Sequence, residues 1–161
     1  MRIRGYDYAL PGWYYVTLCT ELREPLFGEL NHGRMRLSEA GDIVLDEWLR
    51  CDEVRENVRI DEFTIMPDHL HGIIVLTAAD PQRKPSAGRA RRGSLGAIVT
   101  QFKGQSTKRI NALRGVQGAR VWQPSYYEHV IRDDRDRARI RAYIANNRSH
   151  DDDDPGEPPV W

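Results

Sequence analysis

The segment from His69 to about Thr77 constrains the fold most strongly, because its apolar residues fall on both faces of a strand. Side chains alternate across a strand, so the apolar residues divide into two sets. One set, Ile73 and Val75, lies on the same face as the two histidines. The other set, Ile74 and Leu76, lies on the opposite face of the strand. A strand that is apolar on both faces lies inside a sheet and is covered on each side. The sequence therefore predicts a protein built around a central strand.

Other patterns predict the elements around this strand. Residues 13–19 and 59–66 have strand composition, and a turn at Pro67-Asp68 joins the second of them to the central strand. Residues 121–123 and 128–132 indicate further extended structure. Helices are expected from Ser38 to about Leu49, from Ser94 onward with a kink or end at Gly104, and from Asp133 or Asp134 to about Asn147.

The predicted order is strand, helix, strand, strand, helix, strand, helix. This order indicates an α+β protein with an antiparallel central hairpin, consistent with a ferredoxin-like split βαβ arrangement. At 161 residues and 40% hydrophobic content, the chain fits one domain, which we assign to residues 1–148. It has neither an apolar run of about 18 residues nor a secretory signal, so we expect a cytoplasmic protein.

Charge is segregated along the chain although the formal net charge is zero. Residues 81–120 contain ten basic side chains and no acidic one, whereas residues 149–161 contain five acidic side chains and no lysine or arginine. Without that tail, the body has 24 basic and 19 acidic residues, a net charge of +5. Such asymmetry indicates a polyanionic partner. We expect a mobile basic loop at 81–93 and a disordered, proline-containing acidic tail at 149–161.

Two pairs of residues suggest a reactive site. His69 and His71 share one face of a strand, and Tyr143 and Asn147 share one face of a helix. The histidines can bind one metal ion, although His-x-His in a strand is common and more often satisfies local hydrogen bonds. Two imidazoles with an amide oxygen suit Mn²⁺ and suit Mg²⁺ less well than an all-oxygen site does, so either ion stays open. Tyr126 and Tyr127 are rival candidates for a reactive tyrosine.

One reaction requires all of these parts, namely phosphodiester transesterification. The tyrosine oxygen attacks a DNA phosphorus, and a divalent ion stabilises the leaving 3′ oxygen. Because the ordinary pKa of tyrosine is near 10, orientation and charge neutralisation must supply most of the rate. The product is a 5′-phosphotyrosine link that stores the bond for rejoining.

Five stretches carry a resemblance to a known family: Tyr15 to Thr20, Met66 to His71, Leu95 to Lys103, Trp122 to Arg132, and Tyr143 to Asn147. Together they resemble the REP-associated tyrosine transposases, which are single-tyrosine HUH transposases. The Pro-Asp-His-Leu-His block combined with the final Tyr-x-x-x-Asn is the specific part. One departure is Arg148, where the family pattern usually has proline.

The resemblance implies a ferredoxin-like HUH nuclease fold and a nicking and joining enzyme for single-stranded DNA hairpins of the REP type. Carried over by position, it implies that Tyr143 is the nucleophile and that His69, His71 and Asn147 bind Mg²⁺ or Mn²⁺. Whether the protein is a monomer or a homodimer stays open.

For DNA binding, the sequence offers cations and aromatic rings. The cations that would contact phosphates along the DNA strand are Arg89, Arg91, Arg92, Lys103, Lys108 and Arg109. The rings that would stack on exposed bases are those of Trp122, Tyr126 and Tyr127. Burial in the core is an equal alternative for Trp122. Two other functions stay open, namely a non-catalytic ferredoxin-like module that binds single-stranded DNA or RNA, and a metal phosphodiesterase that uses water.

Overall fold

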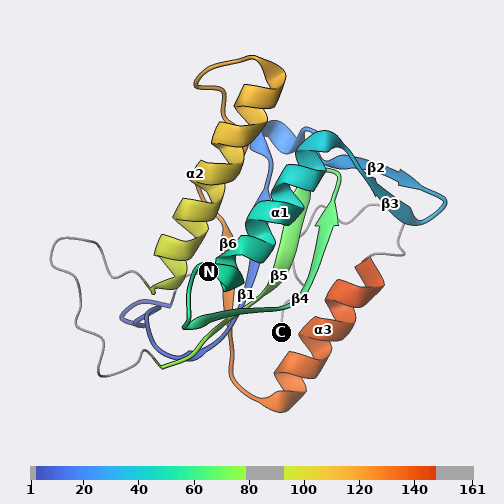
Figure 1. The fold of residues 1–161 in the computed structure, drawn as a ribbon. Coiled ribbons are helices and arrows are strands. Elements are labelled where there is room, and N and C mark those ends of the chain that lie inside the picture. The colour runs from blue at the N-terminus through green and yellow to red at the C-terminus, as the bar shows by residue number, and fades with distance from the viewer. Residues whose placement is uncertain (1–2, 79–92, 148–161) are drawn as a thin grey trace, which may run out of the picture.

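The central strand expected from the sequence is β5 (His69–Leu76), and it lies between two other strands of a four-stranded sheet (Figure 1). The computed structural model describes residues 3–78 and 93–147. The expected basic loop, apart from Gly93, and the acidic tail lie outside the described residues. The other elements follow in chain order: β1 (Gly12–Cys19), the 3₁₀ turn η1 (Glu21–Arg23), β2 (Gly28–Asn31), β3 (Arg34–Leu37), α1 (Glu39–Glu53), β4 (Val58–Met66), α2 (Leu95–Arg114), β6 (Tyr127–Ile131) and α3 (Asp134–Asn147).

The sheet has the strand order β4-β5-β1-β6, and every neighbouring pair is antiparallel. With α1 between β1 and β4, and α2 between β5 and β6, this is the ferredoxin-like arrangement that the sequence predicts. The β2–β3 hairpin is a separate two-stranded sheet that the sequence analysis did not predict.

Helices cover both faces of the sheet, so the protein has two cores (Figure 1). On one face α1 and α2 pack over Tyr14, Val16 and Leu18 of β1. On the other face Ile140 and Ile144 of α3 pack against residues of β1 and β5. Since side chains alternate along β5, the two histidines lie on the α3 face with Ile73.

The two long helices begin at the serines expected to cap them. Ser38 Oγ accepts a hydrogen bond from Gly41 N at 3.1 Å, and Ser94 Oγ accepts one from Ala97 N at 3.2 Å. The predicted kink or end at Gly104 is wrong, because α2 continues to Arg114 and stops at Gly115, which adopts a φ of 66°. Buried residues on both sides of Gly104, including Phe102 and Ser106, hold the helix in place.

Gly72 allows close packing directly behind the histidines. A Cβ atom there would lie 2.7 Å from Phe63 Cβ and 3.0 Å from the Trp48 ring. The strand can therefore pass this close to Phe63 and Trp48 only because Gly72 has no side chain. None of the helices in residues 3–78 and 93–147 is long and apolar enough to cross a membrane.

Candidate active site

His69 and His71 lie at the start of β5, in the middle of the sheet, and both are buried. Their side chains are paired in register with those of β1, His69 beside Cys19 and His71 beside Thr17. His69 is 3% exposed and His71 is fully buried, and their ring centroids are 5.1 Å apart. The expectation that both imidazoles project from one rigid face is confirmed.

Asp68 fixes the ring of His69. Its Oδ1 lies 2.8 Å from His69 Nδ1, and its Oδ2 lies 3.0 Å from Arg23 Nε. Burial opposes ionisation of this carboxyl, but the hydrogen bond with His69 and the charge of Arg23 hold its pKa below the ordinary value. An ionised Asp68 accepts a hydrogen bond from Nδ1–H of His69, so Nε2 is the nitrogen of this ring that can bind a metal ion.

Tyr15 fixes the ring of His71 in a similar way. The Tyr15 hydroxyl lies 3.2 Å from His71 Nδ1, and Thr17 donates a hydrogen bond to the same hydroxyl at 3.1 Å. Burial, with a smaller contribution from His69, lowers the pKa of His71 to about 3. His71 is therefore neutral at physiological pH and can offer a nitrogen lone pair.

The second ring nitrogen of each histidine has no hydrogen-bond partner among the described residues. His69 Nε2 and His71 Nε2 are both buried. A buried polar atom without a partner costs free energy, and native proteins rarely leave two of them side by side. Two imidazoles with held Nδ1 atoms and open Nε2 atoms fit a divalent metal ion.

Tyr143 of α3 faces this pair. Its ring centroid is 5.6 Å from that of His71 and 6.5 Å from that of Tyr15, in edge-on arrangements. The side chain of Tyr143 is half-buried at the border of the α3 core. Asn147 lies one helical turn further on the same side of α3 and is partly exposed. The structure thus brings together the histidines and the tyrosine that the sequence suggested.

The two rival tyrosines lie in different places. Tyr127 of β6 packs edge-on against Tyr15 at 6.1 Å, on the same face of the sheet as the histidines. Burial and the nearby Asp136 raise the pKa of Tyr127, which makes its phenolate harder to form. Tyr126 packs against the core on the opposite face. Tyr127 is therefore the rival that the geometry allows.

Contacts outside the active site position α3. Arg141 donates two hydrogen bonds of 2.7 Å to Asp61, which lies where a bulge shifts the register between β4 and β5. The guanidinium groups of Arg137 and Arg141 lie 4.5 and 5.4 Å from the centroid of the Trp13 ring. At the start of the helix, Asp136 accepts from His129 at 2.9 Å.

Several predicted DNA-binding residues are used within the fold. Trp122 is 5% exposed and donates to Ser106 Oγ at 2.9 Å, so the core alternative is confirmed and a stacking role is excluded. Lys103 was expected to reach solvent, but it is half-buried and donates to the carbonyls of Gln123 and Ser125 at 2.8 and 3.0 Å. Its partial burial lowers its pKa to about 8.

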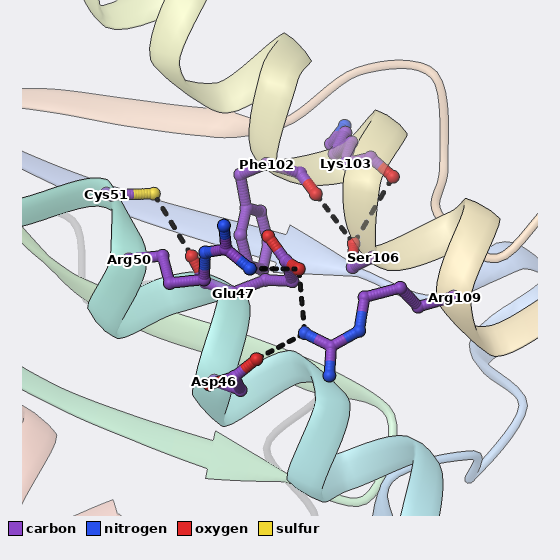
Figure 2. Close-up of polar contacts among 8 residues, drawn as sticks. All are labelled: Asp46, Glu47, Arg50, Cys51, Phe102, Lys103, Ser106 and Arg109. Carbon is purple, nitrogen blue, oxygen red and sulfur yellow. Dashed lines mark hydrogen bonds and ion pairs between the residues drawn. The ribbon is translucent and has the colours of Figure 1, made fainter. Parts of the chain in front are cut away.

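Arg109 joins α2 to α1 instead of pointing freely into solvent. Figure 2 shows its guanidinium between Asp46 and Glu47, with a distance of 2.7 Å to Glu47 Oε1. Glu47 is 7% exposed, so this contact neutralises a buried carboxylate. Lys108 is exposed on α2, whereas Arg89, Arg91 and Arg92 lie outside the described residues.

Sequence reasoning missed the residues that hold the histidines. Asp68 stands inside the Pro-Asp-His-Leu-His block, so its position next to His69 was a signal that could have been used. Tyr15 and Thr17 alternate on the first strand, but their partners depend on strand register, which the sequence does not give. Arg23 and Arg141 bind Asp68 and Asp61, which are distant from them in the sequence, so no local sequence pattern indicates these contacts.

The fold and the site define a class of protein, an α+β protein whose ferredoxin-like sheet presents paired histidines to a helical tyrosine. The sequence model of a protein family, the IS200-like transposases, matches residues 14–147 of this chain. This range includes the two histidines and Tyr143. The chain therefore belongs to the IS200-like transposase family, a family of DNA-transposition enzymes.

Individual proteins show the same likeness. An uncharacterised protein of Haemophilus influenzae is 35% identical over 156 residues, which cover 91% of this chain and 86% of the relative. The structure of a REP-associated tyrosine transposase bound to a REP hairpin is similar with a TM-score of 0.62 at 19% identity, covering 91% of this chain and 72% of that one. A candidate transposase from Deinococcus radiodurans is similar with a TM-score of 0.50 at 22% identity, covering 91% and 97%. These structures support the fold.

Proposed function

We propose that this protein is a metal-dependent endonuclease and strand transferase for single-stranded hairpin DNA, acting through a 5′-phosphotyrosine intermediate at Tyr143. The observation that carries the proposal is the pair of buried, unpartnered Nε2 atoms beside the ring of Tyr143. Membership in a transposase family supports the same reaction class.

His69 and His71 would hold Mg²⁺ or Mn²⁺ through Nε2, and Asn147 would add its side-chain oxygen. Such an ion supplies positive charge that polarises the scissile phosphate and stabilises the leaving 3′ oxygen. The chain prepares its own ligands for this task. Asp68 keeps the proton of His69 on Nδ1, and Tyr15 accepts the Nδ1 proton of His71 when Nε2 ligates.

Tyr143 performs the covalent step. Its oxygen attacks phosphorus and the bond from phosphorus to the 3′ oxygen breaks, so the fragment downstream of the cut becomes linked to the tyrosine through its 5′ phosphate, while the upstream fragment leaves with a 3′ hydroxyl that takes up the proton given up by the phenol. A 3′ hydroxyl can later attack the phosphotyrosine, which restores the phenol and joins the strand. Arg141 and the packing of Ile140 and Ile144 orient the helix that carries this tyrosine.

The proposed substrate is a hairpin of the REP type. A protein with the same fold has been solved bound to a REP hairpin, which supports this substrate class. Lys108 and the segment with Arg89, Arg91 and Arg92 are proposed to contact phosphates, which predicts binding that weakens with salt. Tyr127, on the histidine face, is proposed to stack on an unpaired base.

Covalent capture of labelled DNA tests this proposal. The full chain is mixed with a labelled single-stranded hairpin, with Mn²⁺ or with excess EDTA, and separated on a denaturing gel. A shifted band that forms only with Mn²⁺ is expected, and it should disappear with Tyr143→Phe while hairpin binding stays within a few-fold. Cleavage by Tyr143→Phe without any adduct would indicate a phosphodiesterase that uses water.

A further inference from the structure

The turn after β1 has an unusual backbone. Leu22 has φ 54° and ψ 18°, and the next residue, Arg23, has φ 56°. Residues other than glycine, asparagine and aspartate rarely adopt this left-handed conformation, and a leucine gains nothing local from it. Two such residues in succession persist only where the surrounding structure imposes them.

The surrounding contacts do impose this conformation. Glu21 N donates to Val121 O at 2.8 Å, and Thr20 N donates to Asp68 O at 2.9 Å. The Thr20 hydroxyl donates to Glu24 O at 2.8 Å and closes the turn from inside. The Arg23 side chain binds Asp68 at 3.0 Å. The turn is therefore a rigid support held from both of its sides.

This rigid support presents an apolar side chain to solvent. Leu22 is 90% exposed, the highest value among the exposed large apolar residues of the described chain. Its side chain therefore contributes almost nothing to the core, while its backbone costs stability. An asparagine or glycine would suit the backbone better, so the leucine side chain needs a reason outside the folding of the monomer.

The turn adjoins the proposed active site. Asp68 binds Arg23 of the turn with one carboxylate oxygen and His69 with the other. Two arginines lie at this turn, each paired with a carboxylate: Arg23 lies 3.0 Å from Asp68, and Arg120 lies 3.8 Å from Glu21. The turn lies at the same end of the sheet as the end of α2 (Figure 1). The turn directly follows Cys19, which is paired with His69, so it lies beside the proposed metal ligands.

We propose that Leu22 is a contact for an unpaired base next to the cleaved phosphodiester, resting on the proposed function. Its apolar side chain would pack on the face of the base and keep the strand unstacked, while Arg23 and Arg120 would attract the adjoining phosphates. The rigid turn lowers the entropy cost of this contact, because the side chain is already held in place.

Leu22→Asn separates this role from a purely structural one. Asparagine tolerates the left-handed backbone, so the melting temperature is expected to rise by about 2–4 °C. Affinity for a DNA hairpin with single-stranded arms is expected to fall about 5-fold, in the range of one lost base contact. Leu49→Asn, which changes an exposed leucine of α1 on the far face, is the control and should leave affinity unchanged.

Fluorescence of 2-aminopurine, placed at each position of the single-stranded arms in turn, reports the contact directly. With Tyr143→Phe as background, so that no cleavage occurs, the fluorescence at one position should increase on binding, and Leu22→Asn should remove that increase.

Equal affinity and equal fluorescence with and without Leu22 would overturn the inference. If the wild-type chain gives an adduct in Mn²⁺ while Leu22→Asn changes nothing, only the inference fails. If no adduct forms but the Leu22 effect is present, only the proposed function fails.

Discussion

Arg141 binds Asp61 through two parallel hydrogen bonds of 2.7 Å, and this pair joins α3 to β4 two residues before Tyr143. The carboxylate comes from a bulge in an edge strand, which turns it toward the helix. The hydrogen bonds from Arg141 help to hold the pKa of Asp61 below its ordinary value despite partial burial, so the pair is charged at neutral pH.

Arg141→Ala is therefore expected to slow covalent capture by roughly 10-fold or more at saturating hairpin, because small displacements of a nucleophile carry large rate costs. Hairpin affinity should change much less. The measurement is the single-turnover rate of adduct formation in Mn²⁺. Arg135→Ala removes an exposed arginine of the same helix and serves as the control. Equal rates for the two variants would show that the Asp61 contact does not position Tyr143.

Asp68→Asn should weaken Mn²⁺ binding about 10- to 100-fold, because the amide no longer fixes the His69 tautomer as a carboxylate does. Titration calorimetry on the DNA-free protein measures this without relying on activity. Asp42→Asn, on a helix that covers the other face, should leave the affinity for Mn²⁺ unchanged. An unaltered Mn²⁺ affinity in Asp68→Asn would remove Asp68 from the proposed site.

The fold could be predicted largely because local patterns agree with it. The strand from His69, the serine caps and the last helix appear where apolar periodicity and capping residues indicate them. The β2–β3 hairpin was missed although His32 and Gly33, both with positive φ, form its turn. Its strands have only four residues each, too few for the alternation in Arg34–Leu37 to set them apart.

The site was predictable only in part. His69, His71 and Tyr143 have spacing signals that an analysis of single elements can use. The groups that hold them depend on pairing between distant segments, as in Tyr15 with His71 and Arg141 with Asp61. Arg109 shows the reverse error, since a basic residue on a helix looks like a DNA contact until its carboxylate partners on α1 are known.

The depressed pKa of His71 predicts a pH dependence of stability. In the folded chain this histidine stays neutral down to about pH 3, whereas in the unfolded chain it takes up a proton near pH 6.5. The unfolded state therefore binds more protons between these values, and stability is lost as pH falls through this window. The loss is expected to be on the order of a few kcal/mol by pH 4.

Urea unfolding in the presence of a chelator, at pH 7 and pH 4, measures this loss. His71→Leu removes the titrating group, so its stability should depend less on pH than that of the wild-type chain. Parallel pH profiles for the two proteins would contradict the assignment.

Arg109→Ala and Lys108→Ala, at adjacent positions, should affect different properties, namely folding stability and DNA binding. Arg109→Ala leaves the buried Glu47 without its main partner and is expected to cost about 1–3 kcal/mol of unfolding free energy, with little change in hairpin affinity. Lys108 is exposed, so Lys108→Ala should keep stability and reduce the salt dependence of DNA binding. Urea titration and binding at several salt concentrations distinguish the two. A stability loss confined to Lys108→Ala would reverse the assignment.

Mapping the DNA adduct by mass spectrometry tests the central claim most directly. After capture of a hairpin in Mn²⁺ and digestion with nuclease and trypsin, cleavage after Arg141 and Arg148 releases the peptide 142–148, which contains Tyr143 as its only tyrosine. We predict a nucleotide mass on this peptide, attached through phosphate to Tyr143. A nucleotide mass on the peptide 121–132, which contains Tyr126 and Tyr127, or strand cleavage without any modified peptide, would contradict the account.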